Sequence, residues 1–554
     1  MFFISSLEPT PGRLYTKGSM NRWLSRANQR ISLGSAAALL VVAALFGQLL
    51  GFLRTQIING NFNSPGHITT DAYFAAFKIP DFFFYTIAAG ALGVAFMPFL
   101  ADKLASGDRR SVWKLTSGLL NLLGIIMFGV GIILLVFTEP LIRLVVGNNL
   151  SPDQMHDAVT IMRIVAFNPL LFTISGILTS LQQTFGRFFF FALAPILYNG
   201  CIIASIYIFK DSLGLVGLGI GALAGALLQL LFVFLGLVGL RFRYHLTFHW
   251  ASHDFRRMLK NLPPRSIDQG IDSINSIVET NRAATLCRGY ITFYENAYML
   301  HLVPIMLIGT TIATAAFPRL NDRLAQGRPD LFRRDFLKIL RVMIWIIMPV
   351  AIVTFFGRAY FARLIYKNIA PEIALILGFL VGAIVFRTLY AIISRYFYAQ
   401  KDTRTPLYVS IFAIALNIFL VFSLVSAYGG AQNPGRAITG LAIAQSIVAA
   451  VEVFILLLVM VWRDKLIFTV DFWSGVLRTI SVSGFTIITT YTLVSLIQLE
   501  ATDRGFVTLS SKLLAIVIPT FVVHFALSSL FGMEEAQPVV KKIKQIALKP
   551  VKIQ

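Results

Sequence analysis

Residues 98–107 read Pro-Phe-Leu-Ala-Asp-Lys-Leu-Ala-Ser-Gly, and residues 318–327 read Pro-Arg-Leu-Asn-Asp-Arg-Leu-Ala-Gln-Gly. Six of the ten positions are identical, and Lys103 and Arg323 keep the charge at a seventh. The two copies begin 220 residues apart, and each follows an apolar stretch. This repeat predicts that the chain contains two copies of one membrane-embedded unit. Because duplicated halves of membrane proteins usually enclose a substrate path, this organisation predicts a transporter.

The composition predicts a chain that lies mostly in a membrane. Apolar residues make up 56% of the 554, and charged residues only 13%, about half of what a soluble domain carries. Fourteen apolar runs have the roughly 20 residues that a membrane-spanning helix needs. Helices are expected throughout, because the runs lack the alternation of membrane barrel strands.

A second echo fixes the order of the repeat. Gln182 and Asn199 have the same separation as Gln400 and Asn417, and the two pairs join runs four to five and ten to eleven. The first echo follows runs two and eight, so the period is six helices and the repeats are parallel. We predict an all-α polytopic membrane protein with about fourteen transmembrane helices, arranged as two six-helix lobes and two C-terminal helices.

The expected divisions follow from this count. They are a cytoplasmic N-terminal segment (1–32), an N-lobe (33–262), a C-lobe (263–463), the last two helices (464–532) and a basic cytoplasmic tail (533–554).

The net charge of +22 is placed as the positive-inside rule requires. Lys and Arg gather in alternate loops, whereas the loop at 55–70 has none. The pattern puts both termini in the cytoplasm. We therefore expect the basic loops to contact membrane lipids and not nucleic acid. The basic clusters lie within residues 22–30, 103–114, 241–260, 319–334 and 541–552.

The seventh run carries an unusual polar stripe. Its members recur every three or four residues and therefore share one helix face. Because charges cannot face lipid cheaply, the stripe must line water or meet partner charges. Two interpretations stay open: a hydrophilic cavity wall between the lobes, or a salt-bridge ladder that pairs Arg265 with Asp268 and Glu279 with Arg282. The stripe comprises Arg265, Asp268, Asp272, Asn275, Glu279 and Arg282.

Polar residues also interrupt the first two runs. Arg54 ends the first run, and Asp71 lies near the outer entry of the second. Lys78 and Asp81 are three residues apart on one face, so we expect them to neutralise each other. Prolines within or beside the runs predict broken or bent helices. They are Pro80, Pro169, Pro195 and Pro304.

No pattern for catalysis is present in the sequence. It contains no phosphate-binding glycine loop, no zinc-ligand spacing and no nucleophile elbow. Cys201 and Cys287 have no metal-ligand neighbours, so no zinc site or disulfide framework is implied. We expect a protein that is not an enzyme and holds no metal.

Several stretches resemble the MurJ (MviN) family of lipid II flippases, within the multidrug/oligosaccharidyl-lipid/polysaccharide exporter superfamily. The resemblance covers roughly residues 33–530, including the count of fourteen spans. Its stretches are residues 50–54 (Leu-Gly-Phe-Leu-Arg), 70–80 (Thr-Asp-Ala-Tyr-Phe-Ala-Ala-Phe-Lys-Ile-Pro), 90–91 (Gly-Ala), 95–98 (Ala-Phe-Met-Pro), 180–187 (Ser-Leu-Gln-Gln-Thr-Phe-Gly-Arg), 274–280 (Ile-Asn-Ser-Ile-Val-Glu-Thr) and 400–406 (Gln-Lys-Asp-Thr-Arg-Thr-Pro).

The chain also departs from that family at charged positions. Gln48, Phe84 and Met299 stand where the family usually has arginines, and Ala89 stands in place of an acid. Because a pyrophosphate headgroup needs cationic partners, these departures bear on the substrate and not on the fold.

The resemblance implies an inner-membrane flippase for a lipid-linked oligosaccharide, with lipid II, a peptidoglycan precursor, as the leading candidate. The lobes would alternate between inward-open and outward-open states, and the last two helices would offer a groove for the lipid tail. We expect a monomer, in contact with cell-wall synthesis proteins in the cell. The expected substrate residues are Arg54, Asp71 and Lys78 in one lobe and Asp272, Glu279 and Arg282 in the other.

A driving force and two alternative functions stay open at this point. Sodium or the membrane potential could drive transport, and the expected ion ligands are Glu279, Asn417 and Glu452. By resemblance, some family members hold sodium with this asparagine and an acid one turn later, where this chain has Val421. The alternatives are an ion-coupled small-molecule or drug antiporter, and a transport-inactive paralogue that acts as a scaffold for envelope synthesis.

Overall fold

The computed structural model describes residues 33–64, 66–89, 96–246, 255–256, 263–366, 369–465, 467–500, 502–503 and 505–537. Within these residues the chain is helical apart from short turns and one small hairpin, β1 (Asn63–Ser64) and β2 (His67–Ile68). The predicted N-terminal segment (1–32), the tail beyond residue 537 and the side chains of Arg265 and Asp268 lie outside the described residues.

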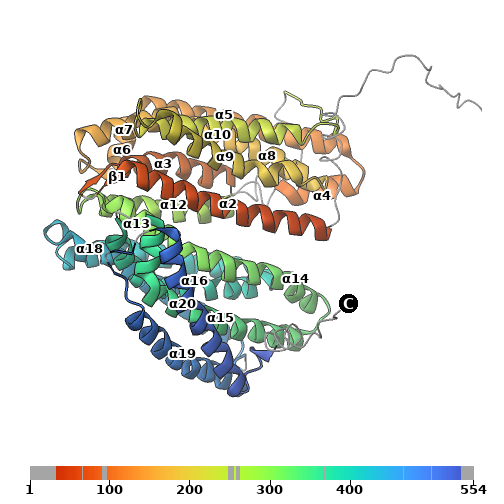
Figure 1. Cartoon of the computed structure of the whole chain (residues 1–554). Helices are drawn as coiled ribbons and strands as arrows, with labels where there is room; N and C mark the ends of the chain where they lie inside the picture. The colour runs from red at the N-terminus through yellow and green to blue at the C-terminus, as the bar shows by residue number, and fades with distance from the viewer. Residues whose placement is uncertain are drawn as a thin grey trace, which may run out of the picture.

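The first half of the chain forms the N-lobe, which is the upper body in Figure 1. A π-helix, η1 (Phe84–Ala89), continues directly from α3. The helices of the N-lobe are α2 (Leu33–Phe62), α3 (Asp71–Phe83), α4 (Met97–Ala105), α5 (Arg109–Val136), α6 (Thr138–Val146), α7 (Pro152–Ile164), α8 (Asn168–Thr184), α9 (Phe189–Phe209) and α10 (Val216–Leu235).

The second half forms the C-lobe, and two further helices pack against its edge. A π-helix, η3 (Ile305–Thr310), joins α13 to α14, and a short 3-10 turn, η5 (Gly430–Gln432), precedes α18. The helices are α12 (Pro263–Ala284), α13 (Tyr290–Pro304), α14 (Thr311–Ala325), α15 (Pro329–Tyr366), α16 (Ala370–Ala399), α17 (Arg404–Ala427), α18 (Pro434–Arg463), α19 (Val470–Leu496) and α20 (Phe506–Leu530).

This architecture confirms the predicted fold class. Among the described residues, eleven helices are long and apolar enough to cross a membrane. The remaining predicted spans correspond to α2, to the interrupted α3–η1–α4 segment, and to the polar α12. Together with these three, the eleven helices are consistent with fourteen spans.

The repeated decapeptide ends the same kind of helix in both lobes. The amide of Gly107 donates to the Leu104 carbonyl (3.1 Å), and the amide of Asp108 to that of Lys103 (3.0 Å). Gly327 and Arg328 repeat these bonds to Leu324 and Arg323, at 3.0 Å each. Both glycines have positive φ, +78° and +67°. Each copy is therefore a Schellman helix end, which requires a left-handed residue and so favours glycine.

The prolines have different consequences along the chain. Pro80 lies inside α3, one turn before η1, and Pro304 ends α13 immediately before η3. The second and eighth spans thus share a proline followed by a π-helix, a departure that is frequent at functional sites. Pro169 is a first-turn residue of α8, where proline is compatible with a helix, and Pro195 lies inside α9.

The hydrophobic core shows how the lobes meet. Around β1, α3, α12 and α13 one buried cluster runs through both lobes, and it includes Ile58 and Ala72 of the N-lobe with Tyr294 and Val421 of the C-lobe. At the opposite end each lobe has a separate core, around Trp113 in the N-lobe and within the C-lobe. The lobes therefore share a core at one end (Figure 1), and α12 extends their contact along α3 to η1, where Gly270 lies against Thr86. The charge of the loops predicts that the joined end faces the periplasm.

The two appended helices are fixed to α15 by a polar seam. Trp345 Nε1 donates to Ser528 Oγ (2.8 Å), and the Thr486 hydroxyl lies 2.9 Å from His524 Nδ1. In the N-terminal part of α15, Arg341 forms ion pairs with Asp471 and with Glu535. Polar contacts inside the membrane suit helix association, because lipid offers these groups no partners.

The orientation can be tested by labelling. We replace Cys201 and Cys287 with serine and introduce single cysteines at Ser64, in β1, and at Ser106, which follows α4. An impermeant maleimide added to intact cells is expected to label position 64 but not position 106, because alternate loops face opposite sides. Labelling of both positions from the same side would contradict the predicted topology.

Candidate functional site

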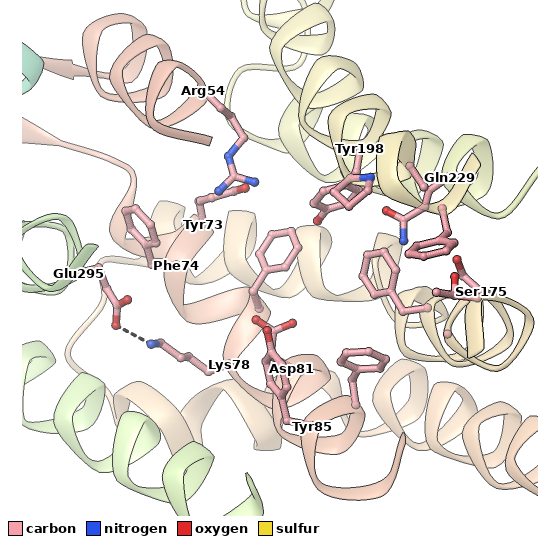
Figure 2. Close-up of a pocket in the computed structure, with 18 residues that line it drawn as sticks. Arg54, Tyr73, Phe74, Lys78, Asp81, Tyr85, Ser175, Tyr198, Gln229 and Glu295 are labelled. Carbon is pink, nitrogen blue, oxygen red and sulfur yellow. Dashed lines mark hydrogen bonds and ion pairs between the residues drawn. The ribbon is translucent and has the colours of Figure 1, made fainter. Parts of the chain in front are cut away.

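A cavity of about 650 Å³ lies beside the joined end of the lobes. Most of its wall belongs to the N-lobe, and α13 of the C-lobe contributes Glu295 (Figure 2). The wall combines aromatic rings with a few charged and polar groups, as ligand sites commonly do. The lining residues are Arg54, Tyr73, Phe74, Phe77, Lys78, Asp81, Phe84, Tyr85, Phe172, Ser175, Gly176, Thr179, Phe191, Ala194, Pro195, Tyr198, Gln229 and Glu295.

One face of α3 and η1 supplies much of this wall. Tyr73, Phe77, Asp81 and Tyr85 follow one another at intervals of four residues, which places them on one side of a helix. Phe84 lines the cavity as well, at the position where the family resemblance leads one to expect an arginine. The cavity is therefore more aromatic and less cationic than that resemblance implies.

Arg54 lies in the cavity as expected from the sequence. Its Nη1 donates to Asn199 Oδ1 of α9 (2.9 Å), while its Nε is buried without a hydrogen-bond partner. A guanidinium with unused donors is suited to an anionic group such as a phosphate.

Lys78 also lines the cavity, but its partner differs from the predicted one. Lys78 Nζ forms an ion pair with Glu295 of α13 and donates to Ser276 Oγ of α12 (2.7 Å). Lys78 therefore does not form an ion pair with Asp81, although its charge still acts on that carboxylate. The ion pair crosses between the lobes, and both side chains are mostly buried. It is drawn as a dashed line in Figure 2.

Asp71 does not line this cavity. Its buried carboxylate lies at the N-terminus of α13, where it accepts bonds from the Gly289 amide, the Thr292 amide (2.8 Å) and the Thr292 hydroxyl (2.7 Å). An anion at a helix N-terminus is stabilised by the orphan amides and by the helix dipole. Hydrogen bonds to a charged group contribute about 1.5–3 kcal/mol each, so Asp71 joins the lobes.

Other polar pairs complete this junction, which we call the inter-lobe clasp. The Thr70 and Thr292 hydroxyls lie 2.9 Å apart, and Asn59 and Asn296 exchange two hydrogen bonds of 3.2 Å. The clasp comprises Asn59, Thr70 and Asp71 of the N-lobe with Gly289, Thr292 and Asn296 of the C-lobe.

Gly289 allows the close approach on which the clasp depends. It has a φ of +93°, and a Cβ atom there would lie 2.9 Å from Ile68 Cγ1 of the N-lobe. Any other residue would therefore be strained and would push the hairpin away from α13.

The polar stripe of α12 does not act as one unit. Glu279 is buried and accepts hydrogen bonds from Asn275 (3.1 Å), Asn417 (2.8 Å) and Gln445. Arg282 instead stacks on the Phe422 ring, 4.0 Å from its centroid. The predicted Glu279–Arg282 step of a salt-bridge ladder is therefore not formed among the described residues. Asp272 is exposed.

The three expected ion ligands fall into two separate networks. Asn417 belongs to the Glu279 cluster, and its Oδ1 is buried without a partner. Glu452 is paired with Arg387 (2.7 Å) and accepts a bond from Ser410 (2.9 Å). Glu452 therefore does not join Glu279 and Asn417 in this conformation.

Sequence reasoning missed several groups that face the cavity. Glu295 is an acid within an apolar span. Charged residues within a span directed attention to α12, and the same criterion would have identified Glu295 in α13. Asp81 was expected to be paired with Lys78 and therefore not to be available to a ligand. The tyrosines at 73, 85 and 198 line the cavity, and a single sequence gives no sign that sets them apart from ordinary aromatic core residues.

The chain is similar to known proteins over most of its length. The model of the family "Lipid II flippase MurJ" matches residues 66–523. A "Probable lipid II flippase MurJ" of Borreliella burgdorferi is 22% identical over 451 residues, which cover 80% of this chain and 86% of the relative. One of Haemophilus influenzae is 24% identical over 446 residues, which cover 74% and 83%.

Solved structures share the fold. "Lipid II flippase MurJ, inward closed conformation" aligns with a TM-score of 0.73 and 22% identity, over 89% of this chain and 98% of that one. An inward-facing multidrug resistance MATE family transporter of the MOP superfamily aligns with a TM-score of 0.63 and 16% identity, over 77% and 99%. At these identities the two likenesses bear on the fold alone.

The hydrogen bonds around Glu279 lead to a prediction about the stability of the protein. Glu279→Ala removes the acceptor of the Gln445 amide and one of the two acceptors of the Asn417 amide, and each buried donor left unsatisfied costs about 1–3 kcal/mol. Arg282→Ala loses only a stacking contact, worth about 0.5–2 kcal/mol. We expect Glu279→Ala to lower the membrane level and the detergent melting temperature, and Arg282→Ala to leave both close to the unaltered protein.

The control is Asp153→Ala, which removes an exposed acid of α7. The double variant Glu279→Arg/Arg282→Glu should be no better than Glu279→Ala. If it restored the level of the unaltered protein, a salt bridge between the two positions would have to exist after all.

Proposed function

Because the chain belongs to the MurJ family of lipid II flippases, we propose that it is an integral membrane protein that moves lipid II across the cytoplasmic membrane. The headgroup would cross through the cavity between the lobes while the lipid tail stays in the bilayer. Both termini would lie in the cytoplasm. The curated relatives are flippases, so the proposal includes no catalytic step.

The observation that carries the proposal is the position of the cavity. It lies beside the end at which the lobes share one core, and it holds Arg54 and Lys78, two cations that suit a diphosphate. A charged group within a membrane span is costly unless it serves a substrate or a partner. The cavity could therefore hold a polar headgroup while the lobes change from the inward-open to the outward-open state.

The contacts between the lobes suggest how binding could be coupled to opening. Lys78 is engaged by Glu295 of the opposite lobe. A diphosphate that reached Lys78 would compete with Glu295 and weaken this cross-lobe pair. The clasp at Asp71, together with the hydrogen bonds from Arg288 to Ile68 and from Gln56 to Leu364, would then have to break before the periplasmic end opens. We assign Arg54 and Lys78 to the headgroup and Asp71 to the clasp.

The lipid tail requires an apolar path beside the cavity. The α19–α20 pair keeps its polar seam inside and exposes large apolar residues such as Ile480 and Val522. We propose that the tail lies along this pair in the inner leaflet.

The polar stripe of α12 also has a role in the proposed transport. Asp272 is exposed on α12 and would contact the headgroup once the lobes move. Glu279 and Arg282 do not line the cavity in this conformation, so we propose that they act through the position of α12.

The driving force is proposed to be the membrane potential. The Glu279 cluster offers a sodium ion one carboxylate and the unpartnered Asn417 Oδ1, while amide donors already occupy that carboxylate. Val421 adds no oxygen, whereas hard cations require about six. The residues present do not fit sodium in this conformation. An inside-negative potential, in contrast, favours outward movement of an anionic headgroup by about 2.3 kcal/mol per charge per 100 mV.

Complementation tests the proposed function directly. In bacterial cells depleted of their own lipid II flippase, expression of this chain should restore growth and cell shape. Arg54→Ala should fail to do so at a normal membrane level, because a cavity cation is lost without exposing a buried partner charge. Arg54→Lys should recover part of the activity, since a lysine supplies charge without the guanidinium fork.

The alternatives give other results. An antiporter would not restore growth but would give pH-dependent or sodium-dependent efflux, and a scaffold would do neither. Restoration of growth by Arg54→Ala as effectively as by the unaltered chain would contradict the assigned role of Arg54.

The driving force is tested in proteoliposomes loaded with fluorescent lipid II. Replacing sodium with choline should leave the flipping rate unchanged, while dissipating an inside-negative potential should lower it. A rate that depends on sodium and not on the potential would contradict the proposal.

A further inference from the structure

The charged groups around the cavity balance one another. Among the described residues, the charged side chains that line it are Arg54, Lys78, Asp81 and Glu295. Two are cations and two are anions, so their formal charges sum to zero. A cavity built only to hold a diphosphate would carry an excess of positive charge. The balance indicates that the bound headgroup brings positive as well as negative charge.

Asp81 is the charged group in this set that makes no hydrogen bond or ion pair within the described part of the chain, although the charges of Lys78 and Arg54 act on it from nearby. Arg54 donates to Asn199, and Lys78 is paired with Glu295. The Asp81 carboxylate makes no hydrogen bond or ion pair with any described residue, and its side chain is exposed. Figure 2 shows it in the middle of the lining residues, between Lys78 and Tyr85. A carboxylate in a membrane span without a partner is expected to serve a ligand.

The rings around Asp81 favour a particular kind of ligand group. Phe172 contacts Phe84 (centroids 5.7 Å apart) and Tyr198 (5.3 Å), both edge to face. Tyr85 lies one turn after Asp81 and also lines the cavity. Aromatic faces attract cations, and a carboxylate beside them adds a hydrogen-bonding anion. A protonated amine is the group that uses both features.

We propose that Asp81 is a specificity-determining residue that pairs with a protonated amine of the transported headgroup. This inference rests on the proposed function and adds the class of substrate: a lipid-linked saccharide whose headgroup carries a free amine as well as its diphosphate. The diphosphate lies toward Arg54 and Lys78, and the amine lies against Asp81. The amine offsets part of the negative charge that the diphosphate brings into a cavity whose own charge is zero.

A hydroxyl would serve Asp81 less well than an amine. Both can donate a hydrogen bond to the carboxylate, but only the amine compensates its charge. In a cavity bounded by apolar rings, an uncompensated carboxylate beside an incoming diphosphate is unfavourable, because like charges repel more strongly where water is scarce. Discrimination between an amine and its acetylated form therefore tests the proposal directly.

The experiment uses the full-length protein in proteoliposomes with two probes. One is a fluorescent polyprenyl-diphosphate saccharide with a single free amine on its headgroup, and the other is its N-acetylated counterpart. The unaltered protein should flip the amine-bearing probe about tenfold faster, the difference expected for one charged hydrogen bond. Asp81→Asn should lose this preference by slowing the amine-bearing probe alone, and Asp81→Glu should keep it.

Asp153→Asn is the matched control, because it removes an exposed acid outside the cavity. Equal rates for the two probes in the unaltered protein would overturn the proposal without reference to any variant. An equal slowing of both probes by Asp81→Asn would also overturn it, since Asp81 would then act on transport in general. If the unaltered protein flipped neither probe and failed to restore growth, the proposed function itself would fail, and this inference with it.

Discussion

The conformation depends on one carboxylate that belongs to one lobe and caps a helix of the other. Asp71 accepts two backbone amides and one hydroxyl at the N-terminus of α13. A buried charge is tolerated there only because these donors replace water. The contact needs Gly289, since a side chain at that position would collide with Ile68. The shared hydrophobic core then forms around this junction and holds this end of the lobes shut.

The cavity follows from the same junction. Once α3 and α13 are held together at the clasp, Lys78 and Glu295 lie within reach of each other one to two turns further along. Together they form an ion pair between the lobes, and a charged ligand could replace one of its partners. The aromatic face of α3 and η1 forms the wall beside it. The chain thus combines a strong contact at the joined end of the lobes with a weaker, exchangeable one in the cavity.

The sequence was sufficient for the architecture and insufficient for side-chain partners. Repeated helix ends at Gly107 and Gly327, the apolar runs and the breaks after Pro80 and Pro304 depend on local chemistry, and the structure agrees with them. Partners depend on packing between distant segments. Lys78 has a local acid three residues away yet pairs with Glu295, 217 residues along the chain. Glu279 and Arg282 share a helix face, but one meets amides and the other a phenylalanine ring.

The central claim is that the clasp must open for transport, and a reversible cross-link tests it most directly. The Thr70 and Thr292 hydroxyls are 2.9 Å apart, so cysteines at these positions lie within reach of a disulfide. In a chain with Cys201 and Cys287 replaced by serine, oxidation of the Thr70→Cys/Thr292→Cys variant should stop lipid II flipping, and reduction should restore it. The two single variants should not respond to oxidation. Flipping at an undiminished rate by the fully cross-linked protein would contradict the account.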